Sequence, residues 1–259
     1  MIPAERQRFI RKALDSKGMV SFADMAEQLG VSHMTVRRDM QLLEQQGWLR
    51  FISGGAQIVE RIASELPQAE KRRLQFAEKV AIAQKAVSLI RPGAAVYFDA
   101  GTTCLAVAEA VTAREDLRDS IFAVSNDFTV VGHLMEHANC RLFHTGGEVL
   151  RENKSTSGET AATMISRLNI DIAFLSTSSW NAEWISTPAE SKVAVKVAAA
   201  KVARQAFLVT DSSKYGQMGL FNILPVCELD GVITDINLPL PAQKALTAAG
   251  VTVMLAETE

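Results

Sequence analysis

Five polar side chains gather near the start of one predicted helix, on the side expected to face solvent. They are Ser32, His33, Thr35, Arg37 and Arg38. Serine and threonine hydroxyls can donate hydrogen bonds to phosphates or bases, and arginine can reach phosphates or guanine edges. A plain helical bundle with solvated arginines and a surface histidine would carry the same residues. The pattern therefore indicates nucleic-acid binding as a hypothesis that neighbouring segments must support.

A short segment that follows this helix supports the hypothesis. Residues 48–59 read as two short strands around a turn that contains Ser53, Gly54 and Gly55, and Arg50 lies just before the turn. Because glycine has no side chain, its backbone can approach a phosphate closely. We expect this hairpin to be the wing of a winged helix-turn-helix domain that binds double-stranded DNA.

Three predicted helices must position these groups, at 4–16, 21–29 and 32–46. The turn between the second and third helices is three residues long. That spacing lets the third helix cross the second at the angle needed to enter a major groove. The apolar residues of the third helix are expected to face inward. They are Met34, Val36, Met40, Leu42 and Leu43.

From residue 94 onward, strand-like and helix-like runs alternate. Such alternation is typical of βαβ units, which form a mostly parallel sheet covered by helices on both faces. In open sheets of this class, ligands bind at the carboxyl ends of the strands. The predicted strands are 94–98, 121–125, 141–145, 172–177, 206–210, 230–234 and 251–255. The predicted helices are 75–90, 103–113, 127–137, 158–169, 189–204 and 241–248.

Small and polar residues follow several of these strands and predict a ligand pocket. Backbone N–H groups of Gly101, Thr102 and Thr103, with the two hydroxyls, could bind an anion at a helix N-terminus. Lys214 offers a positive charge for a phosphate or a carboxylate. Taken singly, these features are also explained as a helix cap and a surface lysine. The full candidate set is Asp99, Gly101, Thr102, Thr103, Asn126, Gly146, Gly147, Ser178 and Lys214.

The balance of basic and acidic residues differs between the start of the chain and the rest. Residues 1–59 carry eight basic and six acidic side chains, whereas the whole chain has a net charge of -2, which excludes a wholly basic nucleic-acid coat. Residues 60–74 are polar and are interrupted by Pro67. We expect a DNA-binding domain at 1–59, a linker at 60–74, and an effector-binding and oligomerisation domain at 75–259.

Cysteine usage and hydropathy predict the cellular context. The three cysteines, Cys104, Cys140 and Cys227, are far apart and form no CxxC pair, which predicts neither a disulfide framework nor a zinc site. No apolar run reaches the roughly 18 residues of a transmembrane helix, and we expect no signal peptide. We expect a cytoplasmic protein with no metal, no cofactor and no membrane contact.

Taken together, the motifs resemble the DeoR/GlpR family of bacterial sugar-metabolism regulators. Residues 31–40 are similar to the recognition helix of that family, and residues 53–56 are similar to its wing. Further similar motifs lie at 43–47, 79–83, 98–103, 125–127, 146–147, 157–158 and 211–216. The chain departs from the family at Met40, which replaces leucine, and at Ser53, which replaces the histidine of the wing. It also departs at 176–187, where serines and two tryptophans replace a glycine-containing pattern.

The resemblance implies both a fold and a function. The fold is a winged helix-turn-helix joined to an α/β domain like that of ribose-5-phosphate isomerase and CoA transferases. The function is a repressor of a carbohydrate or sugar-acid catabolic operon, which a phosphorylated sugar, or a phosphorylated sugar acid, releases from its operator. Because residues 1–59 have a net charge of only +2, one copy attracts DNA weakly. We therefore expect a homo-oligomer, a dimer or a tetramer, that reads a repeated site.

Two other functions stay open at this point. The first is a sugar-phosphate isomerase-like enzyme with an added nucleic-acid-binding module, in which Asp99, Glu190, Asp211 and Lys214 would supply acid–base groups. No pair of carboxylates stands at a fixed spacing to support that chemistry, so we expect no catalytic residues. The second is an RNA-binding or scaffold module, for which stacking aromatic residues on a sheet or loop would be the signal.

Overall fold

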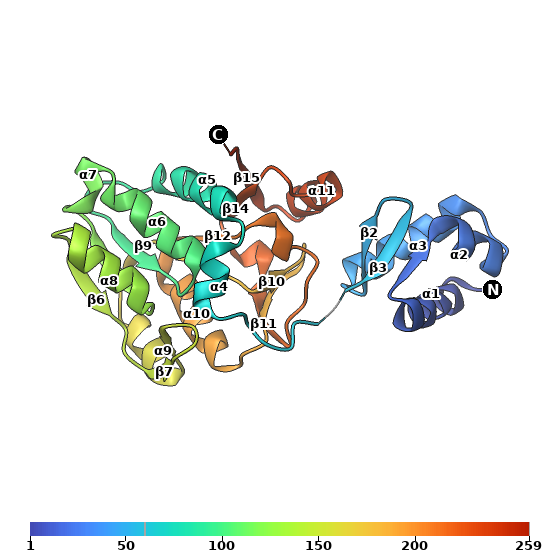
Figure 1. Cartoon of the computed structure of the whole chain (residues 1–259), viewed down its shortest axis with the longest axis horizontal. Coiled ribbons are helices and arrows are strands. Elements are labelled where there is room, and N and C mark those ends of the chain that lie inside the picture. Colours follow the sequence, from blue (N-terminus) through green and yellow to red (C-terminus); the bar gives the residue numbers. More distant parts are fainter. Residues whose placement is uncertain (60, 259) are drawn as a thin grey trace. The chain divides into compact units, whose positions relative to one another are not determined.

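The computed structural model describes residues 1–59 and 61–258, which divide into two compact units (Figure 1). The first unit contains the described residues up to Arg61, together with 216–218, and the second unit contains the others. Residue 60, where the expected linker begins, and residue 259, where the expected second domain ends, lie outside the described residues. Each unit is described by itself.

The first unit combines three helices with a small antiparallel sheet. The strand β3 lies between β1 and β2 and pairs with both. The hairpin of β2 and β3 confirms the two strands predicted around the glycine turn, whereas β1 is too short for a sequence pattern to indicate it. The elements are α1 (Pro3–Lys17), β1 (Met19–Ser21), α2 (Phe22–Leu29), α3 (His33–Gln45), β2 (Leu49–Ile52) and β3 (Gly55–Ile58).

The inward face of α3 is narrower than expected. Val36, Met40 and Leu43 are fully buried, but Met34 is 75% exposed and Leu42 is 43% exposed. Successive residues of an α-helix are rotated by about 100°. Val36, Met40 and Leu43 therefore share one face, whereas Met34 lies roughly opposite it. The prediction that all five apolar residues face inward was wrong for Met34 and Leu42.

A seven-stranded parallel sheet forms the centre of the second unit. Its strands correspond to the seven strands predicted from the alternating pattern, and each pairs in parallel with its neighbours. The order is β15 (Thr252–Ala256), β14 (Gly231–Asp235), β12 (Ala203–Val209), β9 (Ile170–Leu175), β4 (Ala95–Phe98), β5 (Phe122–Ser125) and β6 (Arg141–His144).

Helices cover both faces of this sheet, as expected for βαβ units. On one face pack α5 (Phe76–Val87), α6 (Thr102–Thr112) and α8 (Phe128–His137). On the other pack α9 (Glu159–Ile165), α10 (Ser191–Val202) and α11 (Leu240–Ala248). Within β4 the fully buried Phe98 joins the first core and the fully buried Tyr97 joins the second. This follows because successive side chains of a strand point to opposite faces.

Several short elements lie outside the alternating pattern and were not predicted. The hairpin of β7 and β8 and the antiparallel sheet of β10, β11 and β13 belong to the second unit. The helix α4 falls within the segment expected to be a linker. These elements are α4 (Gln68–Arg73), α7 (Glu115–Arg118), β7 (Glu148–Leu150), β8 (Ser155–Ser157), β10 (Ser179–Trp180), β11 (Trp184–Thr187), η1 (Ser212–Lys214), β13 (Phe221–Pro225) and η2 (Val226–Glu228).

Candidate functional site

The start of α3 presents the predicted DNA-contacting residues. The hydroxyl of Ser32 accepts the backbone N–H of Thr35 over 3.2 Å and so caps the helix. His33, Arg37 and Arg38 are exposed. The guanidinium of Arg37 lies 5.5 Å from the centre of a neighbouring aromatic ring, where a cation–π contact can orient it. The structure thus brings one histidine and two arginines to solvent at the first turns of this helix.

The predicted wing is a tight hairpin. Ser53 and Gly54 are exposed at its tip, and Gly54 has a φ of 78°, a conformation that glycine adopts without strain. Gly55 has a different role, because a Cβ atom there would lie 2.1 Å from a backbone oxygen of Val20. Arg50 is exposed and donates to Gln57 over 3.2 Å. The tip, rather than Gly55, is therefore the part that a phosphate can approach.

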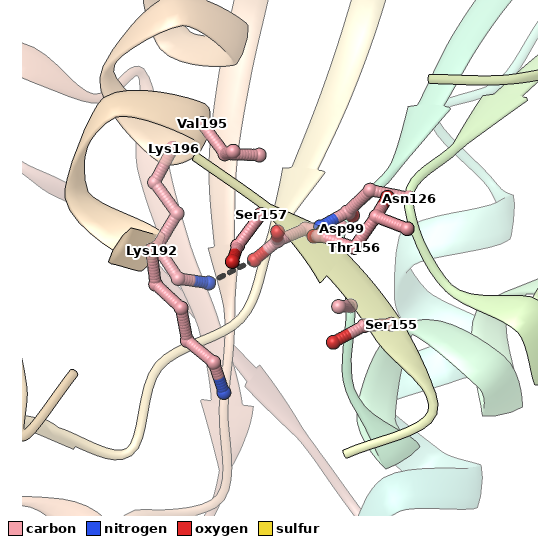
Figure 2. Close-up of a pocket in the computed structure, with 9 residues that line it drawn as sticks. Asp99, Asn126, Ser155, Thr156, Ser157, Lys192, Val195 and Lys196 are labelled. Atoms are coloured by element: carbon pink, nitrogen blue, oxygen red, sulfur yellow. Dashed lines mark hydrogen bonds and ion pairs between the residues drawn. The ribbon is translucent and has the colours of Figure 1, made fainter. Parts of the chain in front are cut away.

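In the second unit a narrow pocket lies beside the carboxyl end of β4, between β8 and α10 (Figure 2). Two members of the predicted set, Asp99 and Asn126, line it. The other seven do not contribute to its lining. The lining residues are Asp99, Ala100, Asn126, Ser155, Thr156, Ser157, Lys192, Val195 and Lys196.

A buried ion pair forms the base of the pocket. The ammonium of Lys196 contacts the carboxylate of Asp99, and the side chains are 5% and 1% exposed. Lys196 also donates to the backbone oxygen of Ser176 over 2.8 Å, and the backbone N–H of Ser176 donates to Asp99 over 2.9 Å. The dashed line in Figure 2 marks the pair between Lys196 and Asp99. Because its charge is compensated locally, Asp99 is held in place rather than left free for a ligand.

Asn126 is fixed by bonds at both ends of its amide. Its oxygen accepts the hydroxyl of Tyr97 over 3.0 Å, and its nitrogen donates to the backbone oxygen of Thr156 over 2.8 Å. Both bonds are buried. Asn126 therefore shapes the pocket wall by tying β8 to the end of β5.

Two serines of β8 have unused hydrogen-bonding capacity. The hydroxyls of Ser155 and Ser157 are buried and have no hydrogen-bond partner within the described residues. Figure 2 shows Ser157 beside Asp99 and Ser155 further along the same strand. Leaving a buried hydroxyl unpaired costs roughly 1–3 kcal/mol. Two such groups in one pocket leave hydrogen-bonding capacity that a polar ligand or an ordered water can take up.

One backbone N–H of the predicted anion site at the start of α6 is bonded within the chain. The backbone N–H of Gly101 donates to Asp127 over 3.0 Å. Thr102 and Thr103 are buried, and the hydroxyl of Thr103 has no partner among the described residues. Burial raises the pKa of Asp127, and the hydrogen bonds that it accepts from Gly101 and from the start of α8 oppose this rise.

The remaining predicted residues lie in three places. Gly146 and Gly147 form the turn between β6 and β7, with φ values of 67° and 112°. A Cβ atom on Gly147 would lie 2.6 Å from the backbone oxygen of Ser157, so this glycine allows the turn to approach β8. Lys214 pairs with Asp211 over 3.2 Å. The structure does not bring these three residues into the lining of the pocket.

The fourth residue, Ser178, belongs to a cluster around Glu65. One oxygen of the Glu65 carboxylate accepts the hydroxyl of Ser178 over 2.7 Å. The other lies 2.9 Å from the ammonium of Lys71 and 2.7 Å from that of Lys192. It also accepts the side-chain amide of Asn153 over 2.9 Å. Glu65 thus connects the segment before α4 to a lysine that lines the pocket.

In this cluster, burial and neighbouring charges shift the pKa of each group in opposite directions. Burial by itself raises the pKa of Glu65, but the ammonium groups of Lys192 and Lys71 outweigh it and hold the pKa well below its usual range. For Lys192, burial is the larger effect and lowers its pKa, although Glu65 acts in the opposite direction. The carboxylate is therefore charged, and it partly compensates a lysine that burial disfavours.

Sequence reasoning missed the two lysines, Lys192 and Lys196, and it missed Glu65. A signal for the lysines was present, since they stand four residues apart in a helix otherwise rich in alanine and valine, which places them on one face. Glu65 gave no such signal, because a polar segment interrupted by proline reads as a solvated linker.

Two negative findings concern the described residues. Within 1–59 and 61–258, no three histidine, cysteine, aspartate or glutamate side chains are grouped so that they could hold a metal ion. Over the same ranges, no helix combines the length and the apolar character that crossing a membrane requires.

Two family descriptions match the chain. Residues 6–62 match the DeoR-like helix-turn-helix domain, and residues 74–236 match the DeoR C terminal sensor domain. The two matches cover the unit that carries α3 and most of the unit that carries the pocket.

Relatives match over nearly the full length. The uncharacterized HTH-type transcriptional regulator YgbI of Escherichia coli (strain K12) is 46% identical over 259 residues, which is 100% of both chains. An uncharacterized HTH-type transcriptional regulator of Haemophilus influenzae is 42% identical and covers 98% of each chain. The glycerol-3-phosphate regulon repressor of Escherichia coli (strain K12) is 29% identical, over 95% of this chain and 96% of its own.

Among solved structures, ribose 5-phosphate isomerase A from Methanocaldococcus jannaschii shares part of the architecture. The match covers 53% of each chain at 16% identity, with a TM-score of 0.40. A likeness of this extent carries no inference about ligand or activity.

Proposed function

The chain belongs to the DeoR family of transcriptional regulators, and from this premise we propose that it is a repressor released from its operator by a phosphorylated metabolite. The regulated genes would form a carbohydrate or sugar-acid catabolic operon. Full-length relatives are named as regulators, so the alternative of an isomerase-like enzyme is not favoured. Since operator DNA is the partner, the site of action would be the bacterial cytoplasm.

The operator-binding surface would be the start of α3 with the tip of the hairpin. Exposed arginines on a helix that follows a three-residue turn support this assignment. The proposed contacts are Ser32, His33, Thr35, Arg37, Arg38, Arg50, Ser53 and Gly54, and the buried Gly55 would support the hairpin behind them. For the chain as a whole, we propose a DNA-binding domain at 1–59, a connecting segment at 60–74 and an effector domain at 75–259.

The effector would bind in the pocket of the second unit. The observation that carries this proposal is the pair of buried, unpartnered hydroxyls of Ser155 and Ser157, which face a site that Lys192 also lines. Hydroxyl groups suit a polyol, and a lysine suits a phosphate or a carboxylate. The name of the glycerol-3-phosphate regulon repressor gives independent support, because it links repression to a regulon for a phosphorylated polyol.

In this proposal the sequence-predicted effector residues differ in how directly they shape the pocket. Asp99 and Asn126 would hold the pocket in shape, and Ser178 would act through the Glu65 cluster. The others would act as supports for neighbouring loops and helices. They are Gly101, Thr102, Thr103, Gly146, Gly147 and Lys214.

The test begins by selecting operator DNA from a random pool with the full-length protein. The operator affinity is then measured by fluorescence anisotropy during titration with phosphorylated aldoses, ketoses and sugar acids and with their unphosphorylated counterparts. We expect at least one phosphorylated compound, and none of the unphosphorylated ones, to weaken binding by about 10–100-fold, which corresponds to a typical allosteric coupling energy. If no phosphorylated compound changes the operator affinity, the proposed regulation is wrong.

The proposal also includes a homo-oligomer. The net charge of residues 1–59 is small, and two copies on a repeated operator would double the number of phosphate contacts. Sedimentation equilibrium of the full chain measures the state directly. A monomer at the concentration that saturates the operator would contradict this part of the proposal.

A further inference from the structure

The pocket and the segment before α4 share one side chain. Lys192 lines the pocket and also pairs with Glu65 at 2.7 Å. We propose that the carboxylate of Glu65 is a resident anion, which occupies the subsite for the phosphate or equivalent dianionic group of the effector until the effector displaces it. The inference rests on the proposed function, because it assigns the regulation of that same pocket.

The chemistry of the groups around Glu65 is that of an anion subsite. Lys71 and Lys192 supply ammonium groups, Asn153 supplies an amide N–H, and Ser178 supplies a hydroxyl. Every one of these groups donates a hydrogen bond, and the Glu65 side chain they surround is only 9% exposed. Donors that converge on one buried position, with two positive charges among them, suit a phosphate as well as they suit a carboxylate.

The balance of charge favours replacement of the Glu65 carboxylate by a phosphate over the binding of both anions at once. Two lysines face a single carboxylate, so the cluster carries an excess of one positive charge while Glu65 is bound. A phosphate monoester carries a charge of about −1.5 to −2 near neutral pH, and it compensates both lysines once Glu65 has left. If Glu65 stayed, two anions would compete for the same ammonium groups. A neutral sugar, by contrast, gains no electrostatic energy from displacing the carboxylate.

The rest of the pocket offers hydrogen-bonding groups beyond the anion subsite. Ser155 and Ser157 line the same pocket as Lys192, and Glu65 leaves their hydroxyls unpartnered. A ligand with an anionic end at the Glu65 cluster and hydroxyl groups beyond it would satisfy both regions. Phosphorylated sugars and sugar acids have this layout.

Other bonds hold α4 in place when Glu65 is displaced. The side chain of Gln68 donates to Thr129 over 2.7 Å and to Asp127 over 3.3 Å. The ammonium of Lys79 donates to the backbone oxygens of Lys71 and Leu74 at the other end of the helix. Loss of the Glu65 contact therefore frees the residues before α4, which lead to the DNA-binding unit, while α4 stays on the second unit.

The first experiment compares Glu65→Gln with Glu70→Gln in the full-length protein. Glutamine keeps the size of glutamate but removes its charge, and Glu70 is an exposed residue of the neighbouring α4. Inorganic phosphate is titrated by calorimetry at constant ionic strength. We expect Glu65→Gln to bind phosphate about tenfold more tightly than the parent, because no carboxylate competes, and Glu70→Gln to match the parent. Equal or weaker binding by Glu65→Gln relative to both would overturn the proposal.

A second measurement uses the parent protein and so does not depend on how a variant folds. Arg61 is exposed, a backbone bridge pairs it with Met218, and it lies four residues before Glu65. Trypsin cleavage after it should therefore become faster when release of Glu65 loosens this stretch of chain. Mass spectrometry follows this one cleavage. Inorganic phosphate and a phosphorylated sugar should each accelerate it several-fold, whereas the neutral sugar should leave it unchanged. Cleavage that is slowed or unaffected by phosphate contradicts displacement.

Failure of this inference can be told apart from failure of the proposed function. If phosphate accelerates cleavage but no phosphorylated sugar changes operator affinity, Glu65 is displaced in a protein whose proposed regulation is wrong. If a phosphorylated sugar weakens operator binding equally in the parent and in Glu65→Gln, and cleavage does not change, the regulation stands and the role of Glu65 is wrong.

Discussion

The backbone N–H of Gly101 donates to the carboxylate of Asp127 over 3.0 Å, at the N-terminus of α6. The same carboxylate accepts the backbone N–H groups of Thr129 and Val130 at the start of α8. One buried aspartate thus caps α8 and also bonds the residue just before α6. Because a helix N-terminus attracts negative charge, Asp127 takes up part of what looked in the sequence like a ligand anion site, whereas the hydroxyl of Thr103 has no partner among the described residues.

Thr103→Val should stabilise the protein. The hydroxyl of Thr103 is buried without a partner in the described part of the chain, so removing it relieves roughly 1 kcal/mol of desolvation cost while the shape is kept. The matched control is Thr177→Val, because the hydroxyl of Thr177 lies within donating distance of two backbone oxygens and its loss should destabilise. Urea unfolding measures both. A destabilised Thr103→Val would indicate that its hydroxyl has a partner, such as an ordered water.

Replacing Arg37 and Arg38 by alanine should remove specific operator binding and leave the fold intact. Both side chains are exposed, whereas the core residues of α3 are untouched. Arginine contacts to bases contribute about 1–3 kcal/mol each, so the double variant should lose about 30-fold or more in affinity. Arg91→Ala, an exposed arginine of the second unit, is the control. Gel-shift titration that finds parent-like binding by the double variant would place the reading surface elsewhere.

The sequence predicts the architecture well, because apolar runs and helix-capping residues are both local signals. Alternating apolar runs mark all seven strands of the sheet, and serine caps mark the starts of α2 and α3. The short strands β10, β11 and β13 carry no comparable pattern. Their register depends on pairing between distant segments, such as Ile185 opposite Leu224.

The site is predictable in location but less so in composition. The strand ends lead to the region where the pocket lies, and Asp99 and Asn126 line it. The groups that give the pocket its charge come from elsewhere, since Lys192 and Lys196 project from α10. A single sequence shows that a helix contains lysines, but the tertiary packing decides which of them turn inward.

Asp99→Asn should destabilise the second unit strongly. Removing one partner of a buried ion pair leaves the other charge uncompensated, which typically costs 3–5 kcal/mol. Here the remaining charge would be the buried ammonium of Lys196. Asp116→Asn breaks an exposed pair with Arg114 and should leave the free energy of unfolding nearly unchanged. Equal effects of the two variants in urea unfolding would mean that the buried pair is solvated.

Lys79 should make the free energy of unfolding depend on pH in the alkaline range. Burial, followed by repulsion from Lys214, lowers its pKa in the folded state from 10.5 to about 8. Between about pH 8 and 10.5, the unfolded chain binds a proton at Lys79 that the folded chain does not, so raising the pH favours folding. Below pH 8 both forms are protonated and this dependence ends. The free energy of unfolding, measured across this range, should rise with pH in the parent relative to Lys79→Met. Parallel profiles for the two proteins would contradict the lowered pKa.

Ser157→Ala should weaken effector binding without lowering the free energy of unfolding. In the absence of effector the serine hydroxyl has no partner, so its removal should leave the free energy of unfolding unchanged or slightly increased. With the phosphorylated sugar that weakens operator binding, the variant should need a concentration about 10-fold higher for the same release. Such a shift corresponds to the loss of one hydrogen bond of about 1–1.5 kcal/mol. Operator affinity without effector should match the parent.

The matched variant for that measurement is Ser179→Ala. The hydroxyl of Ser179 is also buried, but it is already bonded to Ser186, and it does not line the pocket. Its removal should lower the free energy of unfolding while the effector response stays as in the parent. The two serines should therefore show opposite behaviour in the two assays. If both variants lose stability and neither loses effector response, the unpartnered hydroxyl of Ser157 does not mark a ligand site, and the pocket loses its main support.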